Sequence, residues 1–422
     1  MRVVACAAAV AISIALAAAT NPSPAAGAGP RAEQPRAAGS ATWEKPVRDL
    51  LDARAAAVLA RDREAFLATV DPAATETFRD AQRTLFTGLA TVPFDVYSLE
   101  LRADEISDLR AAVLDDRDRA DEIRLPLVEE RLRVSGVDSA DLVNDLWYTF
   151  VRRGDRWYVN EDNDLGDLGL LTQRMLWSYG PVVLTQGENV VVMSRPDDVG
   201  RAEALLAITE EGYGRLRRTL DWPAPPRVLV TLPESTDQLE DILQTTFDLT
   251  NFVAFATADV ERGADVGGWR WTAPRVYAQE ANLARHGRDF QVETLHHELF
   301  HALGFEQAGP FITNWIHEGT AEYEALGHPA PSSVPGTDGK LPLDHEFVTG
   351  GRDRILRAYR ESTSAVAFLA DKAGEDAPKR LFEALGALRL VPGTWEYHLD
   401  QALGRIYGKG TALFEEDWSG GR

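Results

Sequence analysis

Two short segments rich in histidine and glutamate constrain the fold of this chain more than any other feature. The first lies within residues 292–304, whose apolar side chains recur at helical spacing around the run His297-Glu298-Leu299-Phe300-His301. In a helix, residues i and i+4 stand one turn apart on the same face, with Cβ atoms about 5–6 Å apart. Two imidazoles placed in this way can both bind one Zn²⁺ at roughly 2.0–2.1 Å. We therefore predict a helix that carries His297 and His301 as metal ligands and ends at Gly304.

Glu298 directly follows the first of these histidines. It can point to the open side of the metal, where it would accept a proton from metal-bound water. The pattern H-E-x-x-H also occurs by chance, and its histidines are then only solvated or capping groups on a helix. His296 lies about 100° around the helix from His297, so we interpret it as a structural residue or as support behind a ligand.

The second segment is residues 315–323, Trp-Ile-His-Glu-Gly-Thr-Ala-Glu-Tyr, which also has helical character. A catalytic zinc site of two histidines and one glutamate needs a carboxylate from elsewhere, most simply from a second helix packed on the first. Glu318, separated from His301 by sixteen residues, is the best candidate. Glu322, one turn further, could accept the free ring N–H of a ligating histidine and fix its tautomer. The rival assignment makes Glu322 the ligand, and a third interpretation leaves both as surface acids.

Together these segments resemble the gluzincin zinc metallopeptidases, which include thermolysin and the aminopeptidase N family. They are most similar to bacterial peptidase MA-like domains, whose second motif reads Trp-Leu-x-Glu-Gly-x-Ala-x-Tyr. The resemblance covers residues 180–420 and implies a thermolysin-like domain with a small sheet and a mostly helical C-terminal part. It implies Glu318 as the third zinc ligand and peptide-bond hydrolysis by Glu298-assisted attack of a zinc-bound water.

The resemblance also implies an oxyanion donor from a helix that follows the metal site, and Tyr359 is our candidate. A core tyrosine is the alternative for Tyr359, and His317 and His345 are alternative donors. The chain departs from the family in three ways: the gap from His301 to Glu318 is slightly shorter, His317 replaces a small or polar residue, and no Gly-x-Met-Glu-Asn motif is present. The last departure puts exopeptidase action in doubt, because aminopeptidases use that motif to hold the free amino terminus of the substrate, but the sequence does not decide between endopeptidase and exopeptidase action.

Two other functions remain possible from the residues alone. A degenerate metallopeptidase-like domain could serve as a surface binding protein with little or no catalytic activity. Alternatively, the metal could act on an amide or epoxide in a small molecule. The formal net charge of -22 argues against a nucleic-acid partner. It suits solubility or a cationic substrate.

The N-terminus has the layout of an export signal. Arg2 precedes an apolar run over residues 3–19, and small residues, proline, glycine and serine follow. We predict a signal peptide over residues 1–27, a flexible linker over residues 28–41, and a secreted or cell-surface protein. The run is shorter than the about 20 residues of a membrane span, although an uncleaved anchor is the alternative. The single cysteine, Cys6, lies in this segment, so the mature chain can form no disulfide.

An α+β fold is expected for the remainder of the chain. In residues 42–170, two helices precede antiparallel strands, including a hairpin over residues 146–160. This order resembles the SnoaL-like cone fold, and we predict an accessory domain with possible partner binding. In residues 180–420 we predict a hairpin, a long helix and further short strands, one of them at residues 253–256, before the metal helices. The strand expected within residues 267–279 is predicted to lie at a sheet edge, where an extended peptide could pair with it.

Overall fold

The computed structural model describes residues 41–102, 120–245, 249–250, 252–262, 269–308, 312–334, 337–347, 349, 351–387 and 395–420. The predicted signal peptide lies outside these residues, as do Cys6 and all of the predicted linker except Ala41. Within the described ranges, no helix is both long and apolar enough to cross a membrane. The fold is mixed α+β with small sheets, as predicted.

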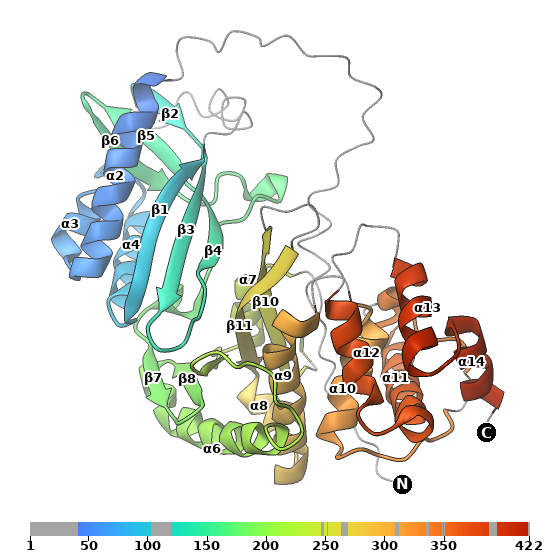
Figure 1. Ribbon diagram of the computed structural model, residues 1–422. Coiled ribbons are helices and arrows are strands. Elements are labelled where there is room, and N and C mark those ends of the chain that lie inside the picture. The colour runs from blue at the N-terminus through green and yellow to red at the C-terminus, as the bar shows by residue number, and fades with distance from the viewer. Residues whose placement is uncertain are drawn as a thin grey trace, which may run out of the picture.

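The N-terminal part packs three helices against antiparallel strands (Figure 1). The helices are α2 (Ala41–Ala60), α3 (Arg63–Leu67) and α4 (Glu76–Leu89). One sheet has the order β1 (Phe94–Arg102), β3 (Leu127–Val134), β4 (Leu142–Trp147), and the other has the order β2 (Glu122–Arg124), β5 (Thr149–Arg153), β6 (Arg156–Glu161). Every second residue of β3 is buried, as expected for a strand with one face on a core. The predicted helices and the predicted hairpin are present, whereas α4 and β1 were not predicted.

A five-stranded mixed sheet begins the second part, in the order β10-β11-β9-β8-β7. Its strands are β7 (Val183–Gln186), β8 (Val190–Ser194), β9 (Val228–Thr231), β10 (Ala254–Arg262) and β11 (Trp269–Ala278). Pairing is parallel from β8 through β9 to β11 and antiparallel at both outer pairs. The prediction that β11 lies at an edge is wrong, because the short strand expected at residues 253–256 extends to Arg262 and covers β11. The edge strand on this side of the sheet is therefore β10, and β7 lies at the opposite edge.

Helices make up most of the remaining chain. They are α6 (Val199–Leu216), α7 (Thr236–Leu243), α8 (Glu280–Leu283), α9 (Arg288–Ala308), α10 (Asn314–Ala325), α11 (Arg352–Ala373), α12 (Ala377–Gly386), α13 (Trp395–Ile406) and α14 (Thr411–Gly420), with short 3₁₀ turns η2 (Gly166–Leu168), η3 (Leu176–Tyr179), η4 (Pro196–Asp198) and η5 (Asp344–Phe347). Helix α9 lies between the sheet and the C-terminal helices (Figure 1), so its residues are buried on nearly every side.

Gly304 does not end α9, which continues to Ala308. A Cβ atom at Gly304 would lie 3.1 Å from the Trp222 ring and 3.3 Å from the Phe382 ring. Its lack of a side chain therefore allows these two rings to pack closely against α9. The predicted helix stop is wrong.

The two parts of the chain share an apolar core. Val191, Met193 and Leu229 of the five-stranded sheet belong to the same buried cluster as the N-terminal helices and strands. A buried ion pair adds to this contact, since Arg275 of β11 donates to both carboxylate oxygens of Asp138 at 2.6 and 2.9 Å. The residue ranges 42–170 and 180–420 are thus joined by apolar packing and by charge.

Candidate metal centre

The candidate site is formed by two consecutive helices, α9 and α10. Helix α9 carries His297 and His301 one turn apart, and α10 carries Glu318. Close packing of α10 on α11 holds the second helix in place. A Cβ atom at Gly319 would lie only 2.8 Å from the carbonyl oxygen of Ser362 on α11. Glycine at this position allows the close approach of α11 behind Glu318.

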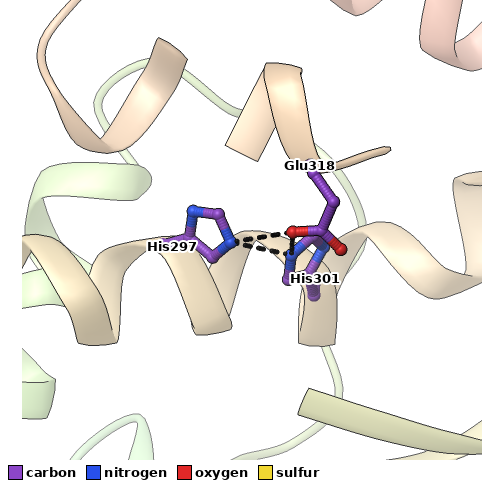
Figure 2. A group of neighbouring side chains, drawn as sticks. All are labelled: His297, His301 and Glu318. Carbon is purple, nitrogen blue, oxygen red and sulfur yellow. Dashed lines mark hydrogen bonds and ion pairs between the residues drawn. The ribbon is translucent and has the colours of Figure 1, made fainter. Parts of the chain in front are cut away.

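His297, His301 and Glu318 converge on one point (Figure 2). Nε2 of His297 lies 3.0 Å from Nε2 of His301. The Glu318 Oε2 atom lies 3.2 Å from the first of these nitrogens and 3.3 Å from the second. In a tetrahedron with metal–ligand bonds of roughly 2.0–2.1 Å, neighbouring ligand atoms are about 3.3 Å apart. The three atoms therefore have the mutual spacing of three corners of a tetrahedral metal site.

Glu322 contacts the opposite side of the His297 ring. Its Oε2 atom lies 3.2 Å from Nδ1 of His297, while Glu318 lies at Nε2. A carboxylate at Nδ1 fixes the tautomer in which Nε2 carries the free lone pair. This geometry favours Glu318 as the ligand and Glu322 as the group that orients His297, over the rival assignment.

Burial and charge set the protonation of the cluster. Burial lowers the pKa of His301 to about 3, so its imidazole is neutral at pH 7. Burial also lowers the pKa of His297, but hydrogen bonds with Glu318 and Glu322 outweigh it and raise that pKa to about 10. Burial raises the pKa of Glu318, yet the two histidines hold it well below its usual range. A ligating imidazole must be neutral, so a bound cation would replace the proton on His297.

Glu298 is the buried carboxyl group beside this cluster. It is 0 % exposed, and neither carboxylate oxygen has a hydrogen-bond partner within the part of the chain that the structure describes. Burial raises its pKa to about 8, with the charge of His297 opposing and that of Glu318 adding to the shift. The backbone of Ala256 in β10 lies close enough to oppose the shift as well. An unpartnered carboxylate that titrates near neutral pH has the properties of a general base.

The other predicted residues lie in different surroundings. Tyr359 is 1 % exposed in α11, with its ring 5.3 Å from Phe347, so its role as an oxyanion donor stays a prediction. His345 is exposed on η5. His296 is buried, both of its nitrogens are unpartnered among the described residues, and burial lowers its pKa to about 4. His317 stacks on His301 with ring centroids 4.2 Å apart.

Two features of the site were missed by the sequence analysis. The backbone of Ala256 reaches Glu298 because β10 lies against α9, and an alanine in a strand has no sequence signal for such a role. The stacking of His317 on His301 depends on the crossing of α9 and α10. The histidine was visible as a departure from the family pattern, but its partner was not.

Comparisons with protein families, with curated proteins and with solved structures each found no match. The assignment of this site therefore rests on its own geometry. Its donor set of two imidazoles and one carboxylate suits Zn²⁺. With this spacing the three residues could hold a metal ion, with the Glu322 carboxylate behind His297.

Proposed function

We propose that this chain is a gluzincin-type zinc metallopeptidase, in which His297, His301 and Glu318 hold the metal and Glu298 is the general base. One observation carries the proposal. Three buried ligand atoms lie 3.0–3.3 Å apart beside a buried carboxylate that has no hydrogen-bond partner among the described residues. Burying such a carboxylate is costly unless a function or a bound group compensates for it.

A bound zinc ion supplies a Lewis acid that polarises the scissile carbonyl and lowers the pKa of water toward neutrality. Glu298 would take one proton from the attacking water and deliver it to the leaving amine. Burial raises the pKa of its carboxyl group to about 8, which favours uptake of this proton. Glu322 would hold the His297 ring in the ligating tautomer throughout.

An edge strand beside the general base supports a peptide substrate. Among the described strands, β10 pairs only with β11, so its other edge is free of strand pairing. The Ala256 backbone on this strand lies close to Glu298. An extended peptide that adds to β10 as a further strand would bring its carbonyl groups past the general base. This placement favours a peptide over a small-molecule amide or epoxide.

The remaining parts of the proposal rest on sequence. We propose export through residues 1–27, an accessory role for residues 42–170 and an oxyanion contact from Tyr359. The thermolysin-like and cone-like folds also belong to the proposal. A degenerate, binding-only protein is the competing function, and the experiment below separates the two.

Glu298→Gln tests the proposed base directly, because it keeps the shape of the side chain and removes its proton affinity. We expect zinc content per chain to stay at the parent value and hydrolysis of a synthetic peptide library, followed by mass spectrometry, to fall about 10²–10⁴-fold. Glu306→Gln is the matched control, since Glu306 is an exposed residue of the same helix. Equal cleavage by the Glu298 variant and the parent would refute the base assignment. A zinc-loaded parent that cleaves no peptide would favour the binding-only protein.

A further inference from the structure

The two proposed metal-binding histidines are supported in different ways. His297 has the Glu322 carboxylate 3.2 Å from its Nδ1 atom. His301 is equally buried, but its Nδ1 atom has no hydrogen-bond partner among the described residues. A ligating histidine almost always donates its second ring N–H to a carboxylate, a carbonyl or water, and this contact fixes the orientation of the ring. Some other contact must orient the ring of His301.

The His301 ring instead lies against a series of aromatic rings. Its centroid is 4.2 Å from that of His317, and the two planes are 26° apart. The ring of His317 in turn stacks on Phe382 of α12, at 5.7 Å and 16°. Phe305, one turn after His301 on α9, approaches both rings at 6.4 and 5.7 Å. Rings of α9 and α10 thus contact the ring of His301, and Phe382 of α12 packs behind His317.

We propose that His317 is a positioning residue for the metal site, which orients the ligand His301 by ring stacking instead of by a hydrogen bond. The inference rests on the proposed metal function and assigns to His317 a role in metal affinity. Its Nδ1 atom lies 3.9 Å from the Glu318 carboxylate, which is too long for a direct hydrogen bond. Its Nε2 atom is buried and has no partner in the described part of the chain. The contact that His317 makes with the ligand His301 is therefore through the flat face of its ring.

Stacking is suited to this task because it restrains the ring plane. Offset-stacked rings resist tilting and sliding, since either motion reduces the contact and its favourable electrostatics. Rotation of His301 about its side-chain bonds would move Nε2 away from the point at which it meets His297 and Glu318. Removal of the stacking ring should therefore weaken metal binding, even where the fold and all three ligands remain.

Three variants of His317 test separately whether the ring, the volume or the polarity of its side chain supports metal binding. His317→Phe keeps a flat ring without nitrogens, His317→Leu keeps an apolar side chain without a ring, and His317→Asn keeps a polar group without a ring. We expect the Zn²⁺ affinity of the Phe variant to stay within about threefold of the parent. The Leu and Asn variants should bind Zn²⁺ about tenfold more weakly. Affinity is measured by competition with a chromophoric chelator. The visible spectrum of the Co²⁺-loaded protein, which responds to ligand geometry, should match the parent for Phe and differ for Leu.

His296→Asn is the matched control, because His296 is also a buried histidine without hydrogen-bond partners among the described residues, on the ligand helix itself. We expect its zinc affinity to stay within about threefold of the parent. Parent-like affinity in His317→Leu would overturn the stacking role, as would an equal loss in Phe and Leu. Comparing the Zn²⁺ affinities of the Phe and Leu variants decides whether the ring is needed, even if the Asn variant does not fold. A parent protein that binds no Zn²⁺ would instead refute the proposed function itself.

Discussion

The buried ion pair between the two parts of the chain offers a quantitative test of how they are joined. Asp138 follows β3 and accepts two hydrogen bonds from Arg275 of β11, and the two side chains are 1 % and 3 % exposed. Asp138→Ala leaves the guanidinium with one remaining acceptor, the carbonyl oxygen of Pro274 at 3.0 Å. Its Nε atom already lacks a partner among the described residues. Arginine cannot lose its proton in a protein, so the charge must stay buried and unpaired.

Breaking a buried pair from one side costs about 3–5 kcal/mol. Asp138→Ala also removes the acceptor for the Val134 N–H at 2.8 Å, which adds about 1 kcal/mol. We expect Arg275→Met to be milder than Asp138→Ala, because the remaining carboxylate still accepts a hydrogen bond from the Val134 N–H. The double variant should cost less than the sum of the two single variants, since it leaves no unpaired charge.

Urea unfolding followed by tryptophan fluorescence measures these free energies. With an m value of about 3 kcal/mol/M, a loss of 4 kcal/mol lowers the midpoint by about 1.3 M. Asp49→Ala is the control, because it breaks the exposed pair of Asp49 with Lys45, whose side chains are 61 % and 79 % exposed. We expect this control to cost less than about 1 kcal/mol. The reasoning is refuted if Asp138→Ala destabilises the protein no more than the control does. It is also refuted if the double variant loses as much free energy of unfolding as the two single variants together.

Two further outcomes follow from packing and from charge. Gly386→Ala should destabilise the protein by about 1–3 kcal/mol in urea unfolding, because its Cβ would lie 1.4 Å from the carbonyl oxygen of Gln307. Gly404→Ala, in a helix with open space around it, should instead stabilise by about 0.5–1 kcal/mol, and a stabilised Gly386 variant would contradict the packing. Burial lowers the pKa of His328, but hydrogen bonds with Glu375 and Glu324 outweigh it and raise the pKa. The stabilisation from His328 is therefore fully present below about pH 6.5 and is lost as the pH rises through the raised pKa. Thermal unfolding of His328→Asn should lack this loss as the pH rises above about 6.5, and an unchanged profile would count against the assignment.

Local patterns in the sequence sufficed for much of the fold. The sequence predicted strands at the positions of β8 and β9, and the structure buries both, as suits consecutive apolar β-branched residues in a parallel part of a sheet covered on both faces. The order of the strands did not follow in the same way. The extension of β10 to Arg262 decided that β11 is internal, and strand pairing between segments depends on the packing of the whole sheet. Gly304 is a second example. Glycine often ends a helix, but Gly304 instead allows close packing against the rings of Trp222 and Phe382, which are distant in the sequence.

The candidate site divides in a similar way between local and distant determinants. The sequence by itself determined that His297 and His301 share one face of a helix and that Glu298 follows the first, because helical periodicity is a local property of the chain. Only the tertiary structure decided which carboxylate meets both imidazoles at Nε2, and which ring stacks on His301. Those contacts depend on the angle and distance at which α9, α10 and α12 cross. Helix crossings are set by side-chain packing across the whole core, and no short stretch of sequence contains that information.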